Sequence, residues 1–368
     1  MKLLIQRLAV LFTILFCITA CASAPAQPVP SPDNGPGQTP DIPEGPVIPV
    51  DSPNPVLPEE EAESFVLSFA GDCTFATNFN AAPNTGFPGT VGNRYDYPFS
   101  NVLTYFENDD FTIVNLECAL TDADPTEEEM EELSTHKFRF RGPKEYAKIL
   151  TAGSVEFASC ANNHSKDYGA QGLYDTWKAL EAENIYYASF NKTCLATTES
   201  GLKIGLIACN FWLTEESIRA QSQDLRSQGA ELIVVSIHWG NERLYYPLPI
   251  QEEFGHTAID AGADIVFGHH SHTLQPIEQY NGGVIFYSLG NFSFGGNNNP
   301  GDKDTAILQQ EVLRYADGTV VLGDLTVIPC QLSSVSHWND FRPTPYEVGS
   351  EGYLRVLQKL DGTYETPV

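Results

Sequence analysis

The residues best suited to chemistry follow a short apolar run near the middle of the second half of the chain. His269, His270 and His272 come directly after residues 265–267 and Gly268. His270 and His272 are two positions apart, so both rings can point the same way in an extended loop. Imidazoles just past the carboxyl end of a buried strand lie where open α/β sheets keep their ligand sites. A polar loop whose histidines hydrogen-bond locally is the alternative.

Other apolar runs end in residues of the same kind. An aspartate after glycine is commonly a turn residue and a single histidine is commonly structural, but a set at one edge of a sheet favours a metal or catalytic site. Carboxylate, imidazole and amide ligands together suit Mn, Fe or Zn better than a thiolate site would. One carboxylate can bridge two ions about 3.5–4 Å apart. The residues at these ends are Asp72, Glu117, Asn163, His164, His238, His270 and His272.

Alternating strands and helices must position these residues. Apolar, β-branched runs predict strands at residues 65–70, 111–116, 155–159, 185–188, 203–208, 232–237, 265–267 and 284–289. Helical spacing predicts helices at 98–107, 143–150, 171–183, 215–228 and 251–261. A hairpin, 306–315 and 319–327, turns at Asp317-Gly318. The order strand, loop, helix predicts an α/β fold with a largely buried mixed sheet.

The N-terminal residues indicate an export signal. Lys2 and Arg7 precede an apolar stretch, residues 8–18, that is too short to span a bilayer. The run Ile-Thr-Ala before Cys21 resembles the lipobox of bacterial lipoproteins, with cleavage at an Ala-x-Ala site as the alternative. We therefore expect residues 1–21 to be a lipoprotein signal peptide, and Cys21 to anchor the exported chain to the outer face of the cytoplasmic membrane.

Composition sets the remaining boundaries. Residues 22–63 predict a disordered, semi-extended linker, because twelve of the 25 prolines lie between Pro25 and Pro58. Residues 64–330 suffice for one large α/β domain, and the pattern loosens into a tail of uncertain structure at 331–368. The net charge of −28 argues against a nucleic-acid partner. The cysteines have no CxxC spacing, which favours buried thiols over a zinc knuckle, although an exported chain could form disulfides.

Several ordered motifs between residues 65 and 325 resemble the CapA family of bacterial capsule or poly-γ-glutamate synthesis proteins. They are GD, NLE, NNHSKDYG, HWG, GHHSH followed by TLQPIE, and YSLGNFSFG. That family is similar to the calcineurin-like metallophosphoesterases. The resemblance implies a four-layer αββα double β-sandwich flanked by helices. It implies His164 as the general acid facing the leaving group, and as metal ligands Asp72, Glu117, Asn163, His238, His270 and His272.

Two positions depart from the metallophosphoesterase pattern. Thr74 stands where a histidine usually follows the first aspartate by two residues, and Glu117 stands in place of the bridging aspartate. The resemblance implies two divalent transition-metal ions (Mn, Fe or Zn). One ion is the alternative, because Thr74 is not the usual ligand.

Three further residues are candidates for substrate binding. Arg139 and Arg141 alternate in the segment KFRFRGP, so on a strand both would point to one face. With Lys137 and Lys144 they form a basic patch in an acidic protein, which could bind phosphate or carboxylate or could be a solvated strand face. Asn291 could orient a ligand through its amide or could serve a turn.

Two functions are open at this point. The first is a surface-anchored CapA-like lipoprotein with a metal-dependent hydrolase site of the phosphoesterase type, acting on a phosphoester or on a capsule-polymer linkage. The second is a non-catalytic assembly component that holds an anionic polymer such as poly-γ-glutamate. Membrane capsule-synthesis proteins are candidate partners of either. A scaffold with a vestigial site is disfavoured by the intact set of ligands.

Overall fold

A computed structural model describes residues 45–48, 62–82, 84–210 and 213–366. The predicted signal peptide, Cys21 and most of the predicted linker lie outside these residues. Within the linker, β1 (Val47–Ile48) pairs antiparallel with β17 (Val320–Gln331). No helix in the described ranges is long and apolar enough to cross a membrane.

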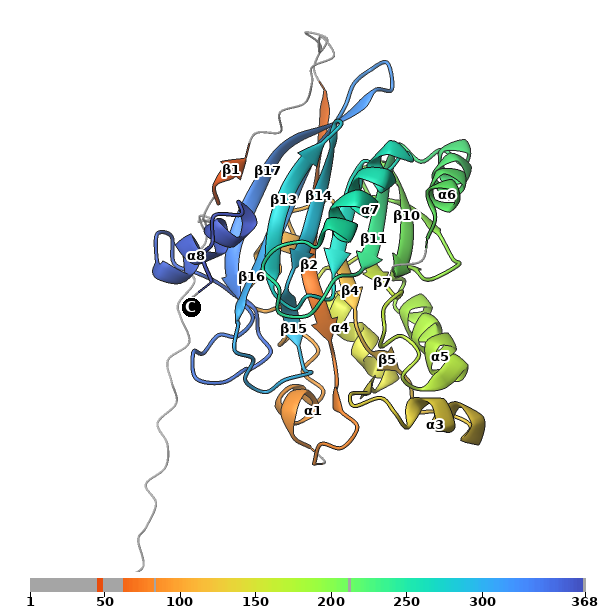
Figure 1. Ribbon diagram of the computed structural model, residues 1–368, viewed down its shortest axis with the longest axis vertical. Helices are drawn as coiled ribbons and strands as arrows, with labels where there is room; N and C mark the ends of the chain where they lie inside the picture. Colours follow the sequence, from red (N-terminus) through yellow and green to blue (C-terminus); the bar gives the residue numbers. More distant parts are fainter. Residues whose placement is uncertain (1–44, 49–61, 83, 211–212, 367–368) are drawn as a thin grey trace, which may run out of the picture. The chain divides into compact units, whose positions relative to one another are not determined.

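Two large mixed sheets and one small sheet form the framework, so the protein is a mixed α/β protein as predicted (Figure 1). The first sheet contains, in spatial order, β1, β17, β16 (Asp304–Arg314), β2 (Glu63–Thr74), β4 (Phe111–Leu116), β7 (Phe157–Ser159) and β8 (Tyr186–Ala188). β15 (Asn291–Phe294) also pairs with β2, and β18 (Thr344–Pro345) pairs with β17. The pairs β2–β4, β4–β7 and β7–β8 are parallel.

The second sheet contains six strands, of which the central four run parallel. In spatial order they are β13 (Leu274–Tyr280), β14 (Gly283–Leu289), β12 (Ile265–His269), β11 (Leu232–His238), β10 (Lys203–Asn210) and β9 (Cys194–Thr197). The small third sheet contains β3 (Thr77–Asn78), β6 (Phe140–Gly142) and β5 (Ala119–Leu120).

The two large sheets pack face to face across one apolar core. Phe69 of β2 contacts Phe267 of β12 and Phe286 of β14 edge-on, with ring centroids 5.2 Å apart in both pairs. Successive residues of a strand face opposite sides of its sheet, and in these strands the residues on both sides are apolar. Leu232 of β11 faces this core, whereas the next residue, Ile233, faces the opposite side of its sheet.

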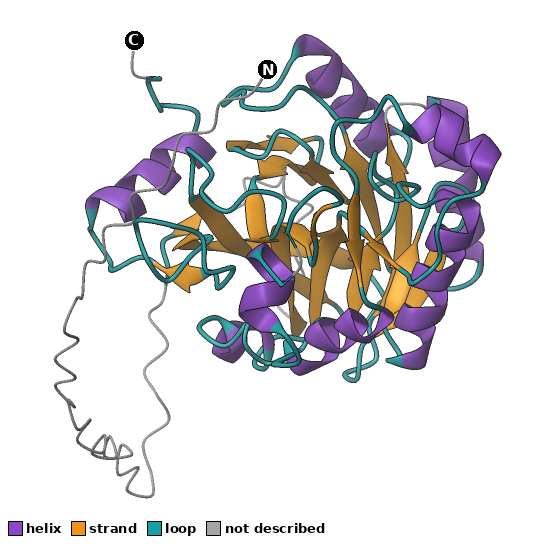
Figure 2. Ribbon diagram, turned by 90° about the horizontal axis from the view of Figure 1, so that it is seen from below, coloured by secondary structure: helices purple, strands orange, loops and turns teal. Residues whose placement is uncertain are grey.

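Helices cover the outer face of each large sheet, and Figure 2 shows the strands in the middle with helices outside them. On the first sheet these are α1 (Gly86–Val91), α2 (Leu103–Phe106), η1 (Lys144–Tyr146), α4 (Ala147–Ala152) and α5 (Gly169–Ala182). On the second sheet they are α6 (Glu215–Ser227) and α7 (Pro249–Asp260). The acidic run predicted as a solvated insertion forms α3 (Glu127–Leu133).

One predicted helix, at residues 98–107, is wrong over most of its length, because only the four residues of α2 are helical and the rest form turns. The hydroxyl of Ser100 donates a hydrogen bond to the carbonyl of Tyr97, 2.9 Å away. Such local bonds from serine compete with the helical ladder.

The C-terminal tail adds ordered structure to the same compact unit. Its helix, α8 (Glu351–Leu360), inserts Val356 and Leu360 into the core between the sheets. Lys359 is buried and its ammonium forms ion pairs of 2.7 Å with Asp302 and 2.8 Å with Asp304. These contacts hold the tail against the start of β16.

Candidate metal centre

The ends of parallel strands from both large sheets meet at one place. Asp72 lies near the end of β2, and Glu117 directly follows β4 of the same sheet. His238 is the last residue of β11, and His270 and His272 follow β12 of the second sheet. Because carboxyl ends of parallel strands share an edge, side chains far apart in sequence come together there.

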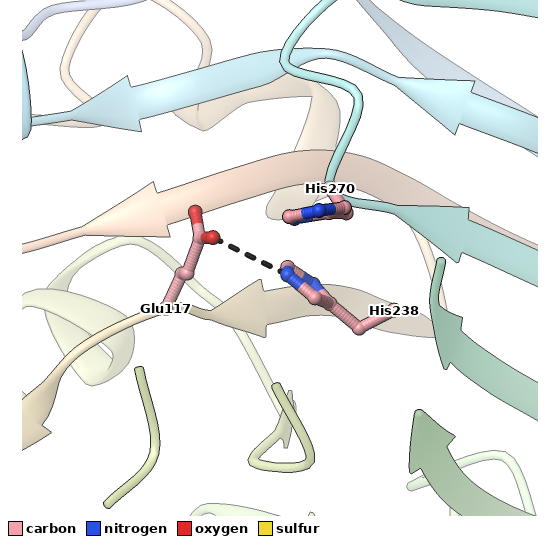
Figure 3. Close-up of side chains that lie close together, drawn as sticks. All are labelled: Glu117, His238 and His270. Atoms are coloured by element: carbon pink, nitrogen blue, oxygen red, sulfur yellow. Dashed lines mark ion pairs between the residues drawn. The ribbon is translucent and has the colours of Figure 1, made fainter. Parts of the chain in front are cut away.

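Five of the six predicted metal ligands form two groups that could each hold an ion. Glu117, His238 and His270 make one group, and Asp72, Glu117 and His272 make the other, with the ligand atoms of each group within 4.8 Å of one another. In Figure 3 the carboxylate of Glu117 points toward the rings of His238 and His270, and its Oε1 lies 3.5 Å from Nε2 of His238. Glu117 belongs to both groups and could therefore supply a ligand atom to each.

The donor atoms of this site fit a cation. Both carboxylate oxygens of Glu117, both ring nitrogens of His238 and Nδ1 of His270 are buried and have no hydrogen-bond partner among the described residues. A buried carboxylate without a partner is costly, and a bound cation removes that cost. The hydroxyl of Thr74 is also buried, and none of the residues described by the structure forms a hydrogen bond with it. Carboxylates with imidazoles are a donor set typical of divalent transition metals.

Burial and mutual charge shift the protonation equilibria of the site. Burial raises the pKa of Glu117 to about 8, and the negative charge of Asp72 adds to this. Burial lowers the pKa of His238 well below its usual range, and the neighbouring His270 contributes. For His272 burial lowers the pKa, but the charges of Glu117 and Asp72 outweigh it and raise the value to about 9. His238 is therefore held as the neutral imidazole, which is the metal-binding form.

The loop that carries two of the histidines is bent, which corrects the extended loop expected from their spacing. His270 and His272 have φ values of 91° and 55°, in the left-handed region that side chains with a Cβ rarely adopt. The backbone N–H of His270 lies 3.4 Å from Oδ2 of Asp72. Strain of this kind persists where the surrounding structure fixes it, commonly at functional sites.

His164 forms a dyad with a carboxylate that the sequence analysis missed. Its Nδ1 lies 2.7 Å from Oδ2 of Asp167, and the N–H of Phe140 donates to the same oxygen at 2.7 Å. Burial lowers the pKa of His164, but the bond to Asp167 and the charge of Glu117 outweigh burial and the net pKa is raised. The spacing of three residues from His164 to Asp167 was the available signal, because it places the two side chains one turn apart.

A chain of hydrogen bonds from two asparagines leads to the carboxylate of Asp72. The amide of Asn115 donates to Oδ1 of Asp72 at 2.8 Å, and the amide of Asn162 donates to the carbonyl of Leu116 at 2.9 Å and to Oδ1 of Asn115 at 3.2 Å. Asn162 is buried, whereas Asn163 is exposed. The role of Asn163 as a metal ligand stays a prediction.

Two more side chains lie next to members of the ligand groups. Oδ1 of Asn291 lies 2.8 Å from Nδ1 of His272, which supports the ligand-orienting role considered for Asn291. Its role in substrate binding stays a prediction. His269 was not assigned a role from sequence, and its Nδ1 lies 3.6 Å from Oδ1 of Asp72 while Nε2 lies 2.9 Å from the hydroxyl of Ser236.

A cavity of about 440 Å³ adjoins the metal centre. It shares His164 and His272 with the site and has several aromatic rings in its wall. Its lining includes Phe138, Phe140, His164, Glu242, Arg243, Tyr245, His272, Asn291, Phe294 and Asp302.

The two arginines of the predicted basic patch lie outside this lining. Arg141 forms an ion pair of 2.8 Å with Asp124, and the guanidinium of Arg139 lies over an aromatic ring and contacts a methionine sulfur. The residues that alternate with them, Phe138 and Phe140, line the cavity instead. Substrate binding by Arg139 and Arg141 stays a prediction. The six cysteines of the described residues are free, and all but one are buried.

Comparison with curated proteins gives several relatives. The chain is 31% identical over 273 residues to the capsule biosynthesis protein CapA of Bacillus anthracis, covering 67% of this chain and 64% of the relative. It is 35% identical over 173 residues to the PGA biosynthesis protein CapA of Bacillus subtilis, covering 41% and 46%. A probable polyglutamine synthesis accessory protein of Mycobacterium tuberculosis is 28% identical over 270 residues, covering 64% and 69%. The chain thus spans less than two thirds of the length of the first two relatives.

Among solved structures, a type I 3-dehydroquinate dehydratase from Clostridium difficile matches with a TM-score of 0.19 and 10% identity over 46% of this chain and 56% of that one, which is too low to compare folds. The family model described as bacterial capsule synthesis protein PGA_cap matches residues 66–296. That span contains both ligand groups and the His164–Asp167 dyad. The resemblance to CapA proteins is confirmed, and the chain belongs to the bacterial capsule synthesis family PGA_cap.

Proposed function

We propose that this protein acts in the synthesis, processing or anchoring of capsule or poly-γ-glutamate, as a metal-dependent hydrolase of the phosphoesterase type. The observation that carries the proposal is the buried carboxylate of Glu117, which is shared by two ligand groups and has no hydrogen-bond partner in the part of the chain that the structure describes. The names of the relatives from the two bacilli, which refer to capsule and PGA biosynthesis, support the biological setting.

The layers of the fold support a metallophosphatase-like αββα sandwich. Two sheets share one core, and helices cover the outer face of each. The ligands come from the carboxyl ends of strands in both sheets, which is where such a sandwich would place a site between its two halves.

In such a hydrolase the side chains would have two roles, metal binding and proton donation. Asp72, Glu117, His238, His270 and His272 would hold the ions, which act as Lewis acids on a phosphoryl or carbonyl oxygen when bound. His164 would protonate the leaving oxygen. Because Nδ1 of His164 is bonded to Asp167, Nε2 is the ring nitrogen available for this transfer. Its raised pKa favours the protonated form that a general acid needs.

A second function is a non-catalytic assembly component that uses the same cavity to hold an anionic polymer. None of the names of the relatives reported above describes a hydrolase, which favours keeping this alternative. In either case we propose that the exported chain is anchored through lipidated Cys21, where it could meet membrane proteins of capsule synthesis.

Three measurements on the same proteins separate these functions. Metal content, turnover of bis(p-nitrophenyl) phosphate and the chain length of poly-γ-glutamate after incubation should be compared in wild type, His164→Ala and His270→Ala. We expect His270→Ala to lose metal and turnover together. His164→Ala should keep the metal and lose about 10²- to 10⁴-fold in rate.

A matched control is His256→Ala, because His256 lies outside both ligand groups and pairs with Glu278 at 2.9 Å. This variant should behave as wild type. Wild type that binds no Mn, Fe or Zn would contradict the metal centre. Metal-loaded wild type that turns over neither substrate, but binds poly-γ-glutamate tightly, would favour the assembly component.

A further inference from the structure

We propose that Arg243 binds a carboxylate of the substrate beside the metal centre and so selects for a carboxylate-bearing chain; this rests on the proposed function. Arg243 lines the cavity that contains His164 and His272. It was not singled out from the sequence, where the basic patch around Arg139 and Arg141 was the candidate for this role.

The guanidinium of Arg243 differs from the others in the described part of the chain. Each of the other eight described arginines has an ion pair, a hydrogen bond or a cation–π contact within the protein. The side chain of Arg243 is exposed, and the described residues offer its guanidinium none of these contacts. A guanidinium left unpaired at the edge of a cavity is available to a ligand.

The backbone of Arg243 is nevertheless fixed to the loop of the metal ligands. Its N–H donates a hydrogen bond of 2.7 Å to the carbonyl of Ser271, which lies between His270 and His272. Its φ of 65° gives the segment a sharp turn. The carbonyl of the next residue, Leu244, accepts hydrogen bonds from Thr273 and Gln275 at 2.8 Å and 3.0 Å. The backbone from which the Arg243 side chain extends is therefore held next to the candidate metal centre.

The rest of the cavity makes Arg243 decisive for an anionic ligand. Asp302 is paired with the ammonium of Lys359, 2.7 Å away, whereas the described residues provide no such ion pair for the carboxylate of Glu242. The protein as a whole carries a charge of −28. An approaching anion is thus repelled by much of its surroundings, and Arg243 attracts it together with protonated His164 and any bound metal ions.

A carboxylate is the group that this arrangement fits. Guanidinium presents a planar fork of donors that can bind both carboxylate oxygens at once. Aromatic rings of Phe138, Phe140 and Phe294 form an apolar wall in the same cavity, suited to methylene groups between carboxylates. Glutamate joined through its γ-carboxyl group keeps one free α-carboxylate on every residue, with methylenes between. The cavity of about 440 Å³ has the size of a small-ligand site.

The test compares two fluorescent oligomers, one of γ-linked glutamate and one in which every α-carboxylate is an amide. Their affinities for manganese-loaded protein should be measured for wild type, Arg243→Ala and Arg243→Lys. Arg219→Ala is the matched control, because Arg219 is partly exposed on α6 and its pairing with Glu215 lies outside the cavity. Metal content is measured in each sample.

We expect wild type and Arg219→Ala to bind the acidic oligomer more tightly than the amidated one. In Arg243→Ala the ratio of the two affinities should fall by about 10- to 100-fold, with metal content unchanged. Arg243→Lys should keep part of it. A full preference in Arg243→Ala would overturn the proposal.

Inorganic phosphate serves as a third probe, because it separates failure of this inference from failure of the proposed function. If wild type binds neither oligomer but binds phosphate more tightly than Arg243→Ala does, the anion site stands and the polymer assignment fails. If phosphate binding is also independent of Arg243, the anion site is wrong.

Discussion

The substitution Glu117→Gln should have two effects. It should remove a pH-dependent loss of stability from the metal-free protein, and it should weaken metal binding. Burial raises the pKa of Glu117 from 4.5 to about 8, so the folded protein without metal keeps a proton that the unfolded chain releases. A carboxyl group with a raised pKa makes stability fall as pH rises through the window from about 4.5 to about 8. Between pH 5 and pH 7 this amounts to a fall in stability of about 3 kcal/mol, since one pH unit corresponds to about 1.4 kcal/mol. For a domain of this size that corresponds to about 5 °C in Tm.

The assay is thermal and urea unfolding at pH 5 and pH 7, with EDTA and with Mn²⁺. In EDTA, Glu117→Gln should lack this part of the pH dependence, since glutamine does not titrate. Loss of the Glu117 charge also removes part of the rise in the pKa of His272, which weakens the fall of stability with pH in the same direction. At about 100 times its Kd, Mn²⁺ should stabilise wild type by about 2.7 kcal/mol for each site, and Glu117→Gln by far less.

Glu156→Gln provides the matched control. Burial also raises the pKa of Glu156 to about 8, and its Oε2 accepts a bond of 2.7 Å from the N–H of Thr112. It belongs to neither ligand group. This variant should change the pH dependence in the same direction and leave the stabilisation by Mn²⁺ intact. If Glu117→Gln in EDTA keeps the pH dependence of wild type, or gains as much from Mn²⁺, the reasoning on Glu117 is wrong.

Three other substitutions test separate parts of the structure. Asp167→Asn should lower the pKa of His164, because it removes the hydrogen-bonded carboxylate that raises it, so the fall of kcat at high pH should begin at a lower pH while metal content stays constant; an unchanged pH profile would exclude the dyad from catalysis. Phe69→Ala should cost about 3–5 kcal/mol in urea unfolding, since its buried ring joins the two sheets, and a loss below that of a surface substitution would contradict this packing. Cys21→Ser should move the protein from the membrane pellet to the soluble exported fraction; retention in the pellet after a high-salt wash would rule out the lipid anchor.

Most of the strands could be predicted, because a buried strand appears in the sequence as a short run of apolar, β-branched residues. The run at 111–116 is found as β4 with the same bounds, and the β-branched run at 232–237 is β11 with one more residue. Few polar residues directly follow these apolar runs. Those that follow parallel strands lie at the same edge of the sheet. That is why Asp72, Glu117 and the histidines could be grouped without knowledge of their contacts.

Other features depend on contacts that a pattern does not encode. Strand β13 was not predicted, and it contains Pro276; it lies at the edge of its sheet, where proline is tolerated. Alternation put Arg139 and Arg141 on one face, yet the opposite face, that of the phenylalanines, meets the cavity. Helix α8 could have been found, because Tyr353, Val356 and Leu360 have the spacing of one helical face.

The origin of the ligands in two sheets has a kinetic consequence. Asp72 and His270 are 198 positions apart, and each ligand group combines residues from both sheets. No group exists until the faces of the sheets have packed, so a partly folded chain has no place to capture the ion. Interactions that form after the rate-limiting step of folding slow unfolding and leave the folding rate nearly unchanged. Bound metal would therefore prolong the lifetime of the folded protein without hastening its formation.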